Sequence, residues 1–283
     1  MKKLFSQLQR IGKSLMLPIA VLPAAALLLR LGAGDVFDIP FVMAAGSAIF
    51  DNLALLFGIG VAVGIAHDSS GSAGLAGAVG YLVINNGTQA INSDINMGVL
   101  AGIIGGLTAG ALYNRYHDIE LPDFLGFFGG RRFVPIVTGA AAVILAGIFG
   151  FIWPPIQDAI QFAGQWIIDA GAVGVFVYGF LNRLLIPLGL HHVINSFIWF
   201  VFGEFTTAAG EVVTGDLSRF FAGDPSAGFF MSGFFPMMMF GLPAAALAMY
   251  HSAKPENKKA VSGIFLSVGL TSFLTGITEP IEF

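Results

Sequence analysis

Cysteine is absent from this chain, and charged residues are scarce. The 283 residues include no cysteine, and only 11% are Asp, Glu, Lys or Arg. The missing thiol excludes disulfides, thiolate catalysis, cysteine metal ligands and a phosphocysteine carried by this chain. The net charge of −4 is small, and no basic patch is interleaved with aromatic residues. We therefore expect neither thiol chemistry nor a nucleic-acid partner.

Apolar residues dominate what is present. They form 56% of the chain, and the mean hydropathy of +0.82 lies far from that of soluble domains. Four stretches without Asp, Glu, Lys or Arg are each long enough to cross a bilayer, which takes about 20 residues as a helix. They are residues 69–93, 95–114, 133–157 and 225–253. The sequence predicts an all-α polytopic membrane protein, with broken or re-entrant segments where proline and glycine interrupt apolar runs.

The pattern of apolar residues predicts where individual helices lie. Residues 1–13 place their apolar side chains on one face, as in an interfacial helix, and the apolar run 15–29 follows. Basic residues in 1–13, and in the loops 114–132 and 251–259, predict that these parts and the N-terminus are cytoplasmic. Further spans are expected near 47–66, 71–91, 97–113, 133–153, 171–190 running into 193–202, 229–250 and 260–274.

Two carboxylates follow an apolar run near the C-terminus. Residues 260–278 carry no charge, and Glu279 and Glu282 come next, within the sequence GITEPIEF at 276–283. A carboxylate at membrane depth is costly unless it faces a cavity or a partner, so it indicates a functional site. Pro280 favours a helix break beside Glu279, which makes Glu279 the stronger candidate. Glu282 is equally well explained as a cap or an interface residue.

A second polar group lies in the apolar segment LNRLLIPLGLHHVIN at 181–195. Pro187 and Gly189 interrupt this segment, which favours a broken or re-entrant helix with exposed backbone donors and acceptors. The amides, the imidazoles and the guanidinium suit a neutral polyhydroxyl ligand such as a sugar. The candidate ligands here are Asn182, Arg183, His191, His192 and Asn195.

Simpler interpretations stay open for several polar residues. Arg183 is alternatively a side chain that extends to the membrane interface, and packing alone explains His192. Adjacent histidines diverge, and no cysteine or close carboxylate completes a ligand set, so neither a metal nor another cofactor is expected. Glu204 and Glu211 suit a binding cavity or water equally. The polar groups at 51–52 and 67–71 indicate helix caps and loop residues.

These segments together resemble the membrane-embedded IIC component of the bacterial phosphoenolpyruvate-dependent sugar phosphotransferase system, in its glucose superfamily. The resemblance covers the chain from residue 12 onward. It is carried by GITEPIEF at 276–283, the segment from Arg183 to His191, GLPAAA at 241–246 and HSAKPEN at 251–257. Within the superfamily, INMGVLAGII at 95–104, MSGFFPMMMF at 231–240 and DNLAL at 51–55 are more similar to N-acetylglucosamine permeases than to glucose permeases.

The resemblance implies a homodimer in the bacterial cytoplasmic membrane, surrounded by lipid. It implies an interfacial helix at 1–13, a scaffold and dimerisation region at 14–153 and a sugar-carrying region at 154–283. A IIB partner phosphorylated on cysteine would transfer its phosphoryl group to the sugar 6-hydroxyl. Glu279 would then hold sugar hydroxyls, His191 would lie near the 6-hydroxyl, and Arg183 would orient the site or meet the phosphoryl group.

One departure from the family and two other classes of function stay open. Relatives continue for further helices beyond the Thr-Glu-Pro signature, so we expect the C-terminal part of the family fold to be missing here. The glucose-specific IIC is the alternative within the family. An ion-coupled secondary transporter would use the same glutamate and histidine as a proton relay, and a shortened permease would suit a non-transporting membrane sensor.

Overall fold

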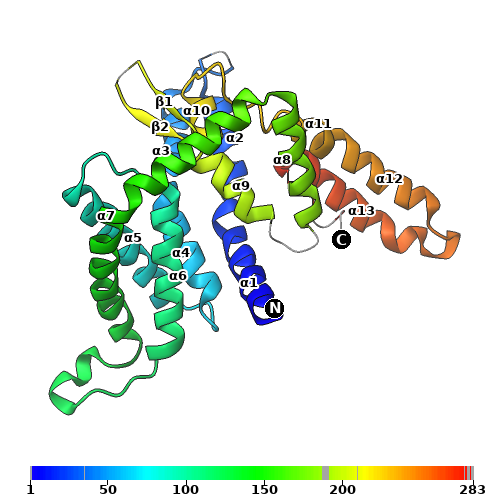
Figure 1. The fold of residues 1–283 in the computed structure, drawn as a ribbon. Helices are drawn as coiled ribbons and strands as arrows, with labels where there is room; N and C mark the ends of the chain where they lie inside the picture. The colour runs from blue at the N-terminus through cyan, green and yellow to red at the C-terminus, as the bar shows by residue number, and fades with distance from the viewer. Residues whose placement is uncertain are drawn as a thin grey trace. The chain divides into compact units, whose positions relative to one another are not determined.

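The fold of the chain was obtained as a computed structural model, which describes residues 2–34, 36–186, 191–208, 210–276, 278 and 281. The described part is mostly helical and has only one short two-stranded sheet, which confirms the predicted all-α class (Figure 1). It divides into two compact units, residues 1–225 and 226–283. The following bounds belong to the first unit: α1 Lys2–Ile19, α2 Leu22–Gly32, α3 Pro40–Asp51, α4 Leu53–Ile65, α5 Gly71–Ile91, α6 Gly98–Tyr116, η1 Asp123–Phe128, η2 Gly130–Arg132, α7 Phe133–Asp169, α8 Ala172–Leu185, α9 His191–Phe200, β1 Glu204–Thr206, β2 Val212–Thr214 and α10 Asp216–Phe221.

Within the described residues, two helices are long and apolar enough to cross a membrane. They are Gly130–Ala159 and Phe234–Ser252, and α3 with α4 makes a third span if that bent pair is counted as one. The prediction of one continuous span at 47–66 is wrong, because this segment is divided between α3 and α4, which are bent by 56° relative to each other. The break falls at Asn52, whose side-chain amide donates to the carbonyl oxygen of Ala48 over 2.9 Å.

Helices α4, α5 and α6 form the centre of the first unit and pack with their backbones nearly in contact. A Cβ atom added to Gly102 would overlap the carbonyl oxygen of Ala54, and one added to Gly77 would overlap that of Gly58. Such close approach is typical of membrane helices, where dispersion contacts replace the hydrophobic effect as the main attraction. Small residues therefore set the spacing of these three helices.

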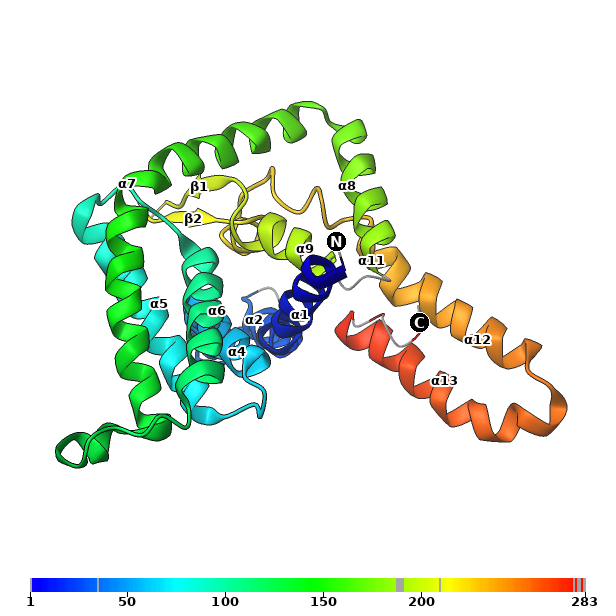
Figure 2. The same ribbon diagram turned by 60° about the horizontal axis from the view of Figure 1, so that its bottom comes forward.

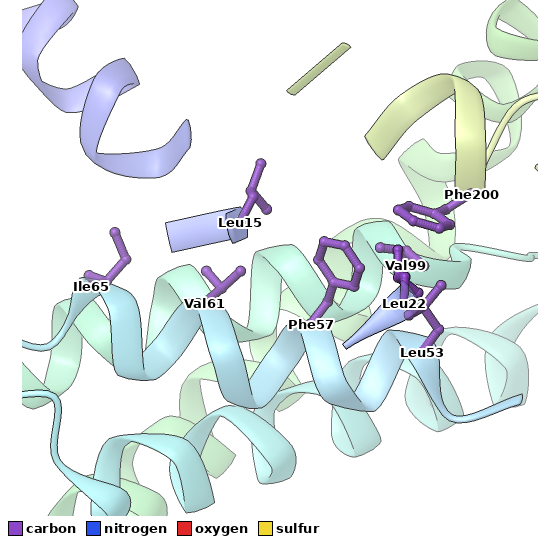
Figure 3. Packing of buried hydrophobic residues seen from close by; sticks show 8 residues of the cluster. All are labelled: Leu15, Leu22, Leu53, Phe57, Val61, Ile65, Val99 and Phe200. Atoms are coloured by element: carbon purple, nitrogen blue, oxygen red, sulfur yellow. The ribbon is translucent and has the colours of Figure 1, made fainter. Parts of the chain in front are cut away.

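The largest apolar cluster among the described residues is built on α4 and joins segments that are far apart in the sequence. One face of α4 supplies four of its buried side chains, and α1, α2, α6 and α9 supply the others (Figure 3). Phe57 meets Phe200 of α9 edge to face, with ring centroids 5.3 Å apart. The cluster consists of Leu15, Leu22, Leu53, Phe57, Val61, Ile65, Val99 and Phe200.

Helix α7 is longer than expected and changes direction along its length. It continues for 37 residues and passes through Pro154 and Pro155, although the sequence predicted an end at Trp153. Figure 2 shows the turn of this helix before it reaches α8. Proline removes a backbone donor and clashes with the preceding turn, which bends a helix without necessarily ending it.

The second unit is a helical hairpin. In it, α12 and α13 pack together, and the hydroxyl of Ser272 donates to the carbonyl oxygen of Met238 over 2.6 Å. Gly276 follows α13 with a left-handed φ of 71°, and its N–H donates to the carbonyl oxygen of Ser272. The helix therefore ends before Glu279. The bounds are α11 Phe234–Pro236, the π-helical turn η4 Met237–Gly241, α12 Leu242–Ser252 and α13 Pro255–Thr275.

Candidate functional site

A buried polar cluster lies between α8 and α9. The side-chain oxygen of Asn195 accepts a hydrogen bond from the hydroxyl of Tyr178 over 3.0 Å and another from the amide of Asn182. Asn182 is 2% exposed, and Tyr178 and Asn195 are similarly buried. Two helices of apolar composition therefore meet through amide and phenol groups, which is an arrangement that fixes their register.

Helical spacing explains why these side chains converge. Tyr178 and Asn182 are four residues apart and share one face of α8, and His191 and Asn195 share one face of α9 in the same way. His191 is only 5% exposed. The structure thus brings three of the predicted sugar ligands, Asn182, His191 and Asn195, to the two helices that meet here. Each has the donors and acceptors that a polyhydroxyl ligand requires.

The remaining predicted site residues have other outcomes. Arg183 is half-buried and one position beyond Asn182 on α8, so it points about 100° away around the helix. Glu279 and Glu282 lie outside the described residues, as does the side chain of His192. The proposed pairing of Glu279 with His191 and Arg183 therefore stays a prediction.

Tyr178 is the member of the cluster that the sequence analysis missed. A single tyrosine in the helix AVGVFVYGFLNRLL is easily taken for a membrane-interface side chain. The available signal was its spacing of four residues from Asn182, which places a hydroxyl and an amide on the same face.

The acidic residues left open by the sequence lie on a short hairpin. Strands β1 and β2 pair antiparallel, with Glu204 opposite Thr214. Glu204 is exposed at the edge of a small pocket, and Glu211 is exposed at the start of the return strand. None of the described sugar-site candidates lines that pocket. Its lining consists of Asn96, Met97, Gly98, Trp153, Gln157, Val201, Glu204 and Thr214.

A buried ion pair closes the turn after α10. The guanidinium of Arg219 donates to one carboxylate oxygen of Asp224 through Nε over 2.8 Å and Nη2 over 2.6 Å. Their side chains are 5% and 6% exposed. The charges of residues 216–224, one arginine and two aspartates, do not by themselves indicate which side of a membrane this loop faces. The structure shows that Arg219 is buried and paired with Asp224 of the same loop.

The Asn195 cluster makes a matched pair of substitutions informative. We expect N195L to lower the free energy of unfolding by about 2–5 kcal/mol, because it leaves the Asn182 amide and the Tyr178 hydroxyl without their shared acceptor. Y178F should cost only about 1 kcal/mol, since it removes one donor and leaves the Asn182–Asn195 bond. Detergent-solubilised protein titrated with denaturant gives both values. Equal losses of stability in N195L and Y178F would show that the shared acceptor Asn195 does not determine the stability of the cluster.

The described residues include helices long and apolar enough to cross a membrane and, on two further apolar helices, a buried polar cluster, which together are typical of an α-helical integral membrane protein. The family model described as "Phosphotransferase system, EIIC" matches residues 12–283. The chain therefore belongs to the EIIC family of the phosphotransferase system, the transferase system that the sequence resemblance indicated.

Several characterised proteins are similar to nearly the whole chain. The "PTS system N-acetylglucosamine-specific EIICBA component" of Escherichia coli (strain K12) is 62% identical over 275 residues, which cover 97% of this chain and 42% of that protein. The "PTS system N-acetylglucosamine-specific EIICB component" of Bacillus subtilis (strain 168) is 57% identical over 280 residues, which cover 99% of this chain and 61% of that protein. A "PTS system glucosamine-specific EIICBA component" of the same Bacillus strain is 51% identical over 296 residues, covering 100% and 47%. The chain thus spans about half the length of these relatives.

Proposed function

We propose that the chain is the membrane part of a sugar permease that moves N-acetylglucosamine across the bacterial cytoplasmic membrane and presents its 6-hydroxyl to a cysteine-phosphorylated IIB partner. The observation that carries this proposal is the buried cluster of Tyr178, Asn182 and Asn195, with the buried His191 four residues before Asn195 on α9, in a chain that is 62% identical to a protein named for this sugar. A neutral sugar with hydroxyl and acetamido groups matches such a set of donors and acceptors.

In this proposal the chain binds and positions the sugar, and the partner supplies the phosphoryl group. Glu279 accepts hydrogen bonds from sugar hydroxyls, His191 lies near the 6-hydroxyl, and Arg183 orients the site or meets the incoming phosphoryl oxygens. Phosphoryl transfer depends mainly on alignment and charge stabilisation, which these groups provide. A homodimer and a cytoplasmic N-terminus are part of the same proposal.

A hybrid permease tests the function directly. It consists of this chain followed by the remainder of the Escherichia coli relative beyond the matched segment, and it is expressed in a strain that lacks that relative. We expect uptake of radiolabelled N-acetylglucosamine that depends on phosphoenolpyruvate and yields sugar phosphate inside the cell. Accumulation of unmodified sugar under a proton gradient would select the secondary transporter, and no sugar binding at all would favour the sensor.

The identity of the sugar is a separate question, because one similar protein is named for glucosamine. A site built to hydrogen-bond one group of its substrate rejects an analogue that lacks this group by about 10⁴-fold or more. Competition of labelled N-acetylglucosamine uptake by unlabelled glucosamine and glucose ranks the three sugars. Stronger competition by glucosamine or glucose than by N-acetylglucosamine itself would reassign the substrate within the family.

His191 has a role in this proposal that kinetics can separate from folding. We expect H191A in the hybrid permease to lower sugar phosphate formation by about 100-fold, the low end of what a positioned proton-transfer group contributes. Because the imidazole is assigned to the 6-hydroxyl, sugar binding should weaken much less than turnover. Phosphorylation rate and sugar affinity are measured on the same purified preparation. A normal rate in H191A would return His191 to a packing role.

A further inference from the structure

The connection between α6 and α7 exposes an unusual amount of apolar surface. It contains the 3₁₀ segment η1, in which Phe124 is 84% exposed, Phe127 70% and Phe128 45%. Leu125 between them is also exposed. Four large apolar side chains within five residues need an explanation here, because η1 lies before the apolar span that starts at Gly130.

The neck of this loop is closed by a backbone hydrogen bond, and its tip makes further local contacts. The N–H of Gly130 donates to the carbonyl oxygen of Ile119 over 2.8 Å, and Gly130 adopts a left-handed φ of 59°. Just after the loop, the Arg132 guanidinium lies 4.7 Å from the ring centroid of Phe127 in the tip and donates to the carbonyl oxygen of Phe127 over 3.1 Å. Residues 119–130 therefore form a short closed loop with a preorganised apolar end.

The base of the loop is fastened to the connection between α4 and α5. The Arg131 guanidinium donates to Asp68 over 2.9 Å, and the Tyr113 hydroxyl donates to the same carboxylate oxygen over 2.8 Å. Desolvation raises the pKa of Asp68, but the Tyr113 hydrogen bond and the charges of His67 and Arg131 outweigh it and hold the pKa below its usual value. Asp68 is thus ionised at neutral pH, and the contact is lost only when the pH falls through that lowered pKa.

Continuity with the spanning helix indicates what covers the tip. The 30-residue span Gly130–Ala159 starts two residues after Phe128, so the tip directly precedes the start of this span in the sequence. Further along this span Ile136, Val143 and Ile144 are also exposed, as expected for a surface that faces lipid. Arg131 and Arg132 lie between the two apolar surfaces, where guanidinium groups complement phospholipid phosphates.

We propose that the apolar tip of loop 119–130, formed by Phe124, Leu125, Phe127 and Phe128, inserts into the headgroup region of the phospholipid leaflet beside the start of α7. Aromatic rings with an adjacent cation suit this zone, because it offers apolar contact on one side and water or phosphate on the other. The closed neck lowers the ordering cost of insertion. The loop thereby fixes the depth at which α7 enters the bilayer.

The absence of cysteine makes a site-specific test simple. F124C and F128C each introduce a single thiol for an environment-sensitive fluorophore, in the otherwise cysteine-free chain reconstituted in phosphatidylcholine and phosphatidylglycerol vesicles. D118C is the aqueous control, since the Asp118 side chain is 79% exposed in the same connection. I144C is the lipid control within α7, where Ile144 is 65% exposed.

Quenching then separates the possible surroundings of the tip. We expect lipids with a nitroxide near the headgroup to quench both tip labels several-fold more than the D118C label, while aqueous iodide quenches them several-fold less. A nitroxide at the end of the acyl chain should quench the I144C label more strongly than the two tip labels. Iodide quenching equal to that of D118C would place the tip in water and overturn the proposal. Protection from both quenchers would also overturn it, because a second copy or another protein would then cover the tip.

Discussion

Sugar uptake by the hybrid permease should fall by about 100-fold or more when Glu279 is replaced by glutamine. A hydrogen bond to a charged group contributes about 1.5–3 kcal/mol, and each 1.4 kcal/mol changes an equilibrium tenfold. A carboxylate that holds two sugar hydroxyls therefore accounts for at least this factor. An amide of nearly the same shape keeps only one acceptor oxygen and adds donors that compete with the hydroxyls.

The control for E279Q is E256Q, which makes the same exchange at an exposed carboxylate in the first turn of α13. E256Q should transport normally, and both variants should match the parent in thermal unfolding and in size-exclusion elution. Unchanged uptake in E279Q would remove Glu279 from the site. If E282Q were inactive instead, the working carboxylate would be Glu282, the alternative that the sequence left open.

The second large effect is expected at the buried ion pair after α10. We expect R219M to lower the free energy of unfolding by about 3–5 kcal/mol, because it leaves the carboxylate of Asp224 buried without its guanidinium partner. The double variant R219M/D224L should recover much of this loss, since an apolar pair of similar volume removes the charge that lacked compensation. Denaturant titration in detergent gives the free energy of unfolding of the parent protein, of R219M and of R219M/D224L.

An exposed pair of the same chemistry provides the control. Arg131 and Asp68 are 2.9 Å apart, but their side chains are 61% and 29% exposed. Water and salt screen this pair, so R131M should change stability far less than R219M does. Similar losses in the two variants would show that burial does not set the strength of the Arg219–Asp224 pair.

The sequence predicted helices best where local signals agree with packing. The segment 71–91 was predicted and observed as α5, because Ser70 caps its first turn and no proline or charge interrupts it. The bend at Asn52 was missed, since neither proline nor glycine marks it. The span predicted at 133–153 was too short, because α7 continues through Pro154 and Pro155 to Asp169. Tertiary contacts decided both cases, and a single sequence does not contain them.

The sequence predicted which residue types belong to the candidate site better than it predicted which side chains contact one another. Asn182, His191 and Asn195 stood out because polar side chains are rare in apolar segments. Their convergence depends on how α8 packs against α9, and helix packing distances do not follow from a single sequence. Tyr178 and the Asp68–Tyr113–Arg131 contacts were missed for the same reason, since those residues are separated by up to 63 positions along the chain.

The close backbone contacts among α4, α5 and α6 limit how this sequence can diverge. At Gly77 and Gly102 even one methyl group would meet a neighbouring carbonyl oxygen, whereas Gly126, Gly147 and Gly263 have no neighbour within 4 Å of a Cβ atom placed there. Larger side chains can therefore replace Gly126, Gly147 and Gly263, but they cannot replace Gly77 and Gly102 without displacing a neighbouring helix. If the proposed sugar ligands on α8 and α9 are correct, substitutions there change substrate preference while these three helices retain their glycines and their spacing.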